Sequence, residues 1–350
     1  MLVVRSDAHL AHDPATELLH GEEVGIYENP ERVARINAAL EARGGHTFSG
    51  PTDHGLGPIE RVHDGALVAY LSVAWHDWLE AGGAALGAIP DSYPNPARRE
   101  GLGAGRPPRT ALGRIGYYSF DTATPMVEGT YGAARAAVDV ALTSLDAVLA
   151  GAPVAYGLCR PPGHHAPRAA FGGYCFFNNA GIAAQAALDA GATRVCVLDV
   201  DYHHGNGTQQ LFYERGDVLF VSLHADPDRA FPYFTGWPDE AGSGRGAGCT
   251  HNHLLDAGCT DAAYLATLER ALQDVAAFDS DVLVVSLGVD TVGTDPIGDL
   301  GVTPAMYEPA GRLVGALGTP TIVLQEGGYD LEVIGPCVAG FLAGVEAARS

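Results

Sequence analysis

The sequence contains no lysine, because all 20 of its basic residues are arginine. This absence excludes any mechanism that needs a lysine amine, such as Schiff-base formation or general-base catalysis by lysine. Basic residues are also few beside 42 acidic ones, and the net charge of −22 argues against binding to a nucleic-acid backbone. The same charge suits a cationic or neutral partner.

Cysteines are scarce and scattered, and long hydrophobic runs are missing. The six cysteines form no C-x-x-C pair, and several lie in apolar segments where a thiol behaves as a small hydrophobic group. We therefore expect free thiols in a reducing, cytoplasmic compartment. No eighteen apolar residues run together, and MLVVRSDAHL lacks the pattern of a signal peptide, so we expect neither a membrane span nor an export signal.

Strand-like and helix-like segments alternate along the whole chain without an evident linker. This alternation predicts one α/β domain over residues 1–350, with a largely parallel central sheet and helices on both faces. Leu2–Val4 is predicted as a first edge strand. Residues 82–129 are rich in Gly, Pro and Arg and show little periodicity, so we expect a long irregular insertion with a functional role.

The stretch VCVLDVDYHHGNG, residues 195–207, carries the strongest chemical signal. Its apolar run is typical of a strand buried on both faces of a parallel sheet, beyond whose carboxyl end the chemistry usually lies. Asp199, Asp201 and His203 share one parity, so an extended backbone would point them the same way. Carboxylates and imidazole converging there suit a divalent metal. A lone D-x-H would more often be a helix cap followed by surface histidines.

Three other stretches supply complementary groups and weaken that plain interpretation. They are RPPGHHAPRAAFGGYCFFNNA (residues 160–180), VVSLGVDTVGTDP (284–296) and LQEGGYD (324–330). The first contains the tandem His164 and His165, the second ends an apolar strand on Asp290, and the third ends another strand on two glycines and Tyr329.

With these motifs in this order, the chain resembles the arginase/deacetylase fold and, within it, the zinc-dependent histone deacetylase family. The resemblance covers nearly the whole chain, including Asn29-Pro30-Glu31-Arg32 and Val62-His63-Asp64, and is closest to the bacterial acetylpolyamine amidohydrolases. It implies a metal-dependent amidohydrolase that deacetylates small acylated amines such as acetylpolyamines.

Asp201, His203 and Asp290 would supply three metal ligands and leave room for water and substrate, as catalytic zinc requires. Two carboxylates and one imidazole are hard enough that Fe²⁺ or Co²⁺ remain alternatives. His164 and His165 would then divide the proton work, one as base toward water and one as acid toward the leaving amine.

The resemblance implies further roles. It pairs His164 with Asp199 and His165 with Asn206, and it makes Tyr329 the donor to the oxyanion. It implies a structural K⁺ site, with the residues Asp199, Asp201, His203, Ser222 and Leu223. It also implies that Gly173, Tyr174 and Phe231 line an acyl-chain tunnel.

The insertion separates the candidate functions. In the acetylpolyamine amidohydrolases such an insertion builds a homodimer and narrows the entrance to the active site. A narrow entrance disfavours a protein substrate, and therefore the first alternative function, protein lysine deacetylation. Yet Leu112 and Ala123 stand where those enzymes carry glutamates that hold remote ammonium groups, so the identity of the amine substrate stays open. Asp121 and Glu128 are acidic residues nearby in the sequence that could take the place of those glutamates. An arginase-like manganese enzyme would need a second aspartate after Asp290. A catalytically inactive binding protein is the remaining alternative, although every matched ligand is present.

Overall fold

The computed structural model describes residues 1–95, 97, 100, 102 and 105–349. Within them, an eight-stranded sheet forms the centre in the order β4-β1-β5-β10-β9-β6-β7-β8, and each neighbouring pair is parallel. Its strands are β1 (Leu2–Val4), β4 (Thr47–Ser49), β5 (Val154–Gly157), β6 (Val195–Asp199), β7 (Val218–Ala225), β8 (Thr250–Leu255), β9 (Val282–Leu287) and β10 (Thr321–Gln325). The predicted parallel sheet is confirmed.

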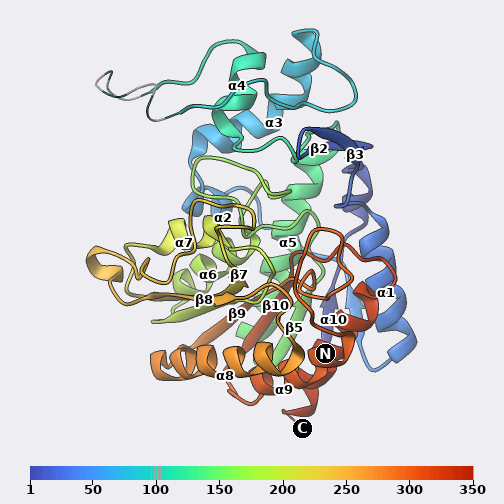
Figure 1. Cartoon of the computed structure of the whole chain (residues 1–350), viewed down its shortest axis with the longest axis vertical. Coiled ribbons are helices and arrows are strands. Elements are labelled where there is room, and N and C mark those ends of the chain that lie inside the picture. The colour runs from blue at the N-terminus through green and yellow to red at the C-terminus, as the bar shows by residue number, and fades with distance from the viewer. Residues whose placement is uncertain (96, 98–99, 101, 103–104, 350) are drawn as a thin grey trace.

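Helices cover both faces of this sheet (Figure 1). One face packs against α1 (Glu31–Arg43), α8 (Asp261–Phe278), α9 (Tyr307–Gly315) and α10 (Ile334–Ala347). The other packs against α2 (Gly57–Val62), α3 (Gly65–Glu80), α5 (Thr130–Leu149), α6 (Asn179–Asp189) and α7 (Asn206–Phe212). Short 3₁₀ helices lie at Asp7–Ala11, Gly244–Gly246 and Pro304–Met306.

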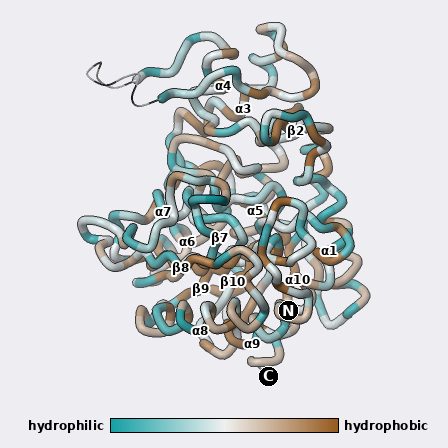
Figure 2. The backbone as a smooth tube through the Cα atoms, in the orientation of Figure 1, coloured by the Kyte–Doolittle hydropathy of each residue, from teal (hydrophilic) through white to brown (hydrophobic). Residues whose placement is uncertain are grey.

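The alternation of side chains along the strands divides the core into two layers. In β6, Cys196 and Leu198 belong to one hydrophobic cluster, whereas Val195 and Val197 belong to the other. All five residues of this strand are buried, which explains why its sequence is a continuous apolar run. Figure 2 shows hydrophobic backbone in the central strands β9 and β10.

Two sequence expectations need correction, and one polar segment forms strands. Strand β1 is not at the edge, because β4 pairs with it on the outer side. The polar residues 9–27 contain the antiparallel hairpin of β2 (Thr16–Leu19) and β3 (Glu22–Gly25). The insertion is not irregular throughout, since α4 occupies Ala111–Tyr118.

Because the sheet strands are parallel, their carboxyl ends meet at one edge. The loops that follow β5, β6, β9 and β10 therefore start side by side, and they are the loops that carry the predicted site residues. In the part of the chain described, no helix is both long and apolar enough to cross a membrane. The division into one domain with an insertion at 82–129 stays a prediction, and its residues 96, 98–99, 101 and 103–104 lie outside the described residues.

Candidate active site

The structure brings Asp201, His203 and Asp290 together at the carboxyl end of the sheet. Each offers one ligand atom, and these atoms lie within 4.8 Å of one another. His203 Nδ1 is 3.3 Å from Asp201 Oδ1 and 3.0 Å from Asp290 Oδ2. Backbone N–H groups orient the carboxylates: Tyr202 donates to Asp290 Oδ1 at 2.9 Å, and Gly327 donates to Asp201 Oδ2 at 2.8 Å.

The charges in this group fit a bound cation. Asp201 and Asp290 are both fully buried, and burial together with the Asp201 charge raises the pKa of Asp290 to about 7. Two carboxylates this close repel each other unless a cation lies between them. Two carboxylate oxygens, one imidazole nitrogen and a neighbouring cavity match the ligand set of a catalytic divalent metal.

The two predicted histidines lie beside this group, each with the predicted partner. His164 Nδ1 is 3.0 Å from Asp199 Oδ2, and His165 Nδ1 is 2.7 Å from Asn206 Oδ1. The two rings are 4.0 Å apart between centroids. His164 also brings Nε2 to 3.8 Å from Asp201 Oδ1, so it faces two carboxylates.

These partners give the two imidazoles opposite charge preferences. Burial lowers the pKa of His164, but Asp201 and Asp199 outweigh it and raise the pKa to about 10. Burial and the neighbouring His164 and His203 hold the pKa of His165 well below its ordinary value. The carboxylates therefore favour the cationic form of His164, whereas the surroundings of His165 favour its neutral form.

Tyr329 follows β10 on a glycine turn. Gly328 has φ +118°, a conformation that glycine adopts readily, and the Tyr329 N–H donates to Asp295 Oδ2 at 2.7 Å. The Gly327 position is equally restricted, because a Cβ there would lie 2.3 Å from Asp290 Oδ2. The Tyr329 ring packs against the Tyr174 ring, with the centroids 5.6 Å apart.

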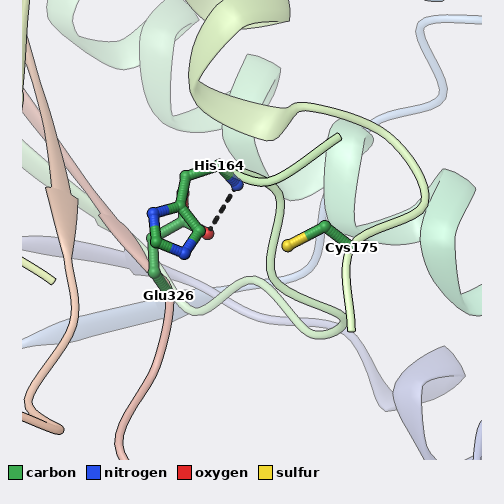
Figure 3. A group of neighbouring side chains, drawn as sticks. All are labelled: His164, Cys175 and Glu326. Carbon is green, nitrogen blue, oxygen red and sulfur yellow. Dashed lines mark hydrogen bonds between the residues drawn. The ribbon is translucent and has the colours of Figure 1, made fainter. Parts of the chain in front are cut away.

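His164, Cys175 and Glu326 form a second group of possible metal ligands, whose ligand atoms lie within 4.8 Å of one another. Figure 3 shows these three side chains. Glu326 Oε2 accepts hydrogen bonds from the N–H groups of Gly163 at 2.6 Å and His164 at 3.2 Å, and Oε1 accepts one from the Ser286 hydroxyl at 3.1 Å. Burial raises the pKa of the Cys175 thiol well above its ordinary value, whereas metal binding needs a thiolate. We therefore interpret these three side chains as structural residues that hold the loop of His164 and His165 in place, and not as a metal site.

A cavity of about 510 Å³ opens onto the metal-ligand group. Of the predicted site residues, it is lined by His165, Gly173, Tyr174, His203, Phe231 and Tyr329. The Phe231 ring meets the His165 ring edge-on at 5.0 Å. Gly173 has φ +57°, and a Cβ there would lie 2.3 Å from His165 Cδ2, so only glycine fits this wall.

The cavity lining also includes residues that the sequence did not single out as site residues. The β2–β3 hairpin contributes Leu18, Leu19, His20, Glu22 and Val24, and later segments contribute Tyr202, Arg229 and Tyr233. Within the hairpin, Glu17 of β2 is fully buried and accepts a hydrogen bond from the Tyr27 N–H at 3.3 Å. No local motif marks these residues, because strands and loops far apart in sequence bring them together.

The residues of the insertion are placed differently from one another. Ala123 lines the cavity, whereas Leu112 lies on α4 with 45 % of its surface exposed. Asp121 also lines the cavity, but its carboxylate accepts hydrogen bonds from the N–H groups of Gly173 and Ala123. Glu128 is exposed, outside the described lining of the cavity.

The residues of the predicted K⁺ site lie beside the metal-ligand group, with which they share Asp201 and His203. Parallel pairing of β6 with β7 sets Asp199 opposite Ser222, and Leu223 follows. All five predicted members (Asp199, Asp201, His203, Ser222 and Leu223) are buried.

The fold and this site define a metal-dependent amide hydrolase of the deacetylase type. The histone deacetylase domain matches residues 26–345, and the chain belongs to the histone deacetylase family. It is 44 % identical over 346 residues to acetylpolyamine amidohydrolase 2 of Pseudomonas aeruginosa, covering 99 % of both chains. Acetylpolyamine amidohydrolase of Mycoplana ramosa is 44 % identical over 345 residues, again covering 99 % of both.

A solved structure agrees with these relatives. The crystal structure of acetylpolyamine aminohydrolase from Burkholderia pseudomallei matches with a TM-score of 0.93 at 38 % identity, over 99 % of each chain. The resemblance inferred from the motifs is thereby confirmed, and the chain is an enzyme of the deacetylase and amidohydrolase class.

Proposed function

We propose that this protein hydrolyses the amide bond of small acylated amines, acetylpolyamines among them. The observation that carries the proposal is the convergence of Asp201, His203 and Asp290 at the cavity where His165 and Tyr329 also lie. The substrate class comes from the names of the relatives, which are acetylpolyamine amidohydrolases that align with this chain over 99 % of their length.

Asp201, His203 and Asp290 would hold the divalent metal ion, which we propose to be Zn²⁺, with Fe²⁺ or Co²⁺ as alternatives. When bound, the ion would polarise the amide carbonyl and acidify a water molecule. Beside it, Asp199, Asp201, His203, Ser222 and Leu223 would hold a structural K⁺.

The unequal environments of the two histidines support different roles, with proton transfer at His165 and charge stabilisation at His164. His165 lines the cavity and is neutral, so it is able to take a proton from water and pass one to the leaving amine. His164 is absent from the described lining and stays cationic between Asp199 and Asp201. We propose that its charge stabilises the negative charge that develops on the substrate oxygen.

Tyr329 would donate to the same developing oxyanion. Its ring lies at the cavity wall, held on one side by Tyr174. A pKa raised well above the ordinary value, by burial first, keeps the hydroxyl protonated and able to donate.

The cavity shape favours a slender substrate. Gly173, Tyr174 and Phe231 form its inner wall, and the β2–β3 hairpin crowds the entrance. An unbranched acylated amine fits such a channel, whereas the backbone of a folded protein would meet the rim. Glu22 at the entrance is exposed and offers a carboxylate to a remote ammonium group, in a region where Ala123 offers none.

We also propose a homodimer formed through residues 82–129. In this segment Leu86, Leu102 and Leu112 expose 64 %, 70 % and 45 % of their surface, apolar area that a second copy of the chain would cover. Light scattering at micromolar concentration should give twice the mass of 36.3 kDa. A monomer, or a dimer that survives deletion of the segment, would contradict this assembly.

A turnover panel with the zinc-loaded protein tests the proposed function. The panel contains acetylated polyamines, acetyl-lysine peptides and amides with longer acyl chains. We expect the acetylated polyamines to be hydrolysed faster than the peptides. Turnover of the peptides alone would indicate a protein deacetylase, and turnover of none would indicate a binding protein.

A further inference from the structure

One of the two edge strands of the sheet carries a further group of metal-ligand side chains, outside the catalytic loops. This strand is β8, and α8 lies along its face (Figure 1). His251 and His253 are two residues apart on β8, so both side chains point to the same face. Asp274 projects toward them from α8. The described lining of the catalytic cavity includes none of the three.

Both imidazoles meet a single carboxylate oxygen. His251 Nδ1 is 2.9 Å from Asp274 Oδ2, and His253 Nε2 is 3.2 Å from the same atom. The three potential ligand atoms lie within 4.8 Å of one another. Around a tetrahedral ion with bonds of 2.0–2.1 Å, neighbouring ligand atoms are about 3.3 Å apart. Small side-chain adjustments would therefore complete the geometry.

The hydrogen bond on the far side of the His251 ring leaves a place for a proton or a metal ion between Nδ1 and Asp274. His251 Nε2 lies 3.1 Å from the backbone carbonyl of Gly248, which only accepts hydrogen bonds. In the neutral imidazole, Nε2 then carries the proton, and the lone pair of Nδ1 faces Asp274 Oδ2. Two acceptors at 2.9 Å repel each other unless a proton or a metal ion lies between them. Donation of the second ring nitrogen to a carbonyl is the usual arrangement of a metal-binding histidine.

The surroundings leave the group accessible. The side chains of His251, His253 and Asp274 are 33 %, 19 % and 32 % exposed, so an ion has an entry path and water has room to complete its coordination. The guanidinium of Arg270 is engaged on its own helix, where it donates to Ala266 and Thr267.

We propose that His251, His253 and Asp274 form a second divalent transition-metal site, which binds Zn²⁺ with water as the remaining ligand. Two imidazoles and one carboxylate are ligands that Zn²⁺ accepts readily, with a fourth position left for water. An ion there ties the edge strand β8 to α8, and because it binds only the folded chain it stabilises the fold. This proposal is independent of the amide hydrolysis proposed above.

Zinc stoichiometry after equilibrium dialysis tests the site. The wild type should hold two equivalents per chain by elemental analysis, and His253→Ala should hold one. Asp290→Ala, which disrupts the catalytic set, should instead keep the second equivalent, so the two proposals fail separately. His76→Ala is the matched control, because His76 is exposed and pairs with Glu80 at 3.2 Å; it should keep both equivalents. Cys249→Ser should keep both as well, which separates thiol binding from this site.

A thermal readout complements the stoichiometry. Added Zn²⁺ should raise the unfolding temperature of the singly loaded wild type and leave that of Asp274→Asn unchanged, a variant that keeps the size of the side chain. The affinity for the second equivalent should fall by more than about ten-fold in Asp274→Asn. One equivalent in the wild type at saturating zinc, or two in both His253→Ala and Asp274→Asn, would overturn the proposal.

Discussion

The guanidinium of Arg32 lies 4.8 Å from the centre of the Tyr329 ring and donates to the carbonyl oxygens of Gly328 at 2.6 Å and Glu326 at 2.5 Å. The remaining nitrogen of the guanidinium, Nη1, forms an ion pair with Glu28 Oε1 at 2.7 Å, and both side chains are buried. Helix α1 thereby holds the turn that presents Tyr329 to the cavity. A planar fork with several partners explains why an arginine is needed at this position.

Replacing Arg32 by lysine should reduce turnover without removing the metal. A lysine has a single ammonium group and cannot reach both carbonyls and Glu28 with the same geometry. We expect kcat to fall on the order of 10–10², the effect of a small displacement of a reacting group. Arg35→Lys is the control, since Arg35 lies on the same helix in an exposed pair with Glu31. Equal kcat values in the two variants would show that the turn does not depend on Arg32.

The Tyr329 hydroxyl should matter for turnover rather than for binding. Tyr329→Phe should keep metal content and substrate affinity but lose roughly 10²–10³ in kcat, because one donor to the oxyanion is gone. Tyr233→Phe, a change at the 42 % exposed tyrosine of the rim, should be nearly neutral. Near wild-type kcat of Tyr329→Phe on an unactivated acetamide would make Tyr329 a structural residue.

Removal of one carboxylate of the metal-ligand group should abolish catalysis. Asp201→Ala and Asp290→Ala each leave two ligands, too few for tight binding, so the catalytic equivalent of metal and activity should disappear together. Asp299→Asn is a control at a neighbouring carboxylate, which accepts from the Tyr202 hydroxyl at 2.9 Å; this variant should keep the metal. The assignment fails if the Asp201 or Asp290 variant retains as much metal as Asp299→Asn does.

Glu17 should make the fold less stable as pH rises above the acid range. Burial raises its pKa from 4.5 to about 7, so between these values the folded state binds more protons than the unfolded chain. Stability therefore falls with rising pH in this window, by at most about 1.4 kcal/mol per pH unit from one proton. Denaturant unfolding from pH 4.5 to 7 should show a shallower decline for Glu17→Gln. Identical slopes would mean that Glu17 titrates normally.

The central strands and the metal ligands could be predicted because their signals are local. The apolar run of β6 and the ligands just after it lie within nine residues, Val195–His203. Strand β8 was missed because its sequence THNHLL is polar, as an edge strand allows. Strand β4 has three residues, too few to show a period, so β1 looked like the edge.

Distant contacts could not be predicted from local patterns. Helix α4 contains Gly113 and Gly116, which lower its helix propensity, yet a Cβ at Gly116 would lie 1.9 Å from the carbonyl oxygen of Ser92. The approach of another segment therefore requires the glycine that obscured the helix. Similarly, nothing near Glu17 in the sequence indicates that Tyr174 packs beside it.

The most direct test of the proposed function is kcat/KM across a salt series. Three substrates are compared: an acetylated diamine, a neutral amide of equal length and an acetyl-lysine peptide. The net charge of −22 should attract the cationic diamine, an effect that fades as salt screens it. We predict that the diamine is the best substrate at low salt and that its advantage over the neutral amide shrinks with salt. A peptide that is much the best substrate at every salt concentration would contradict the proposed function.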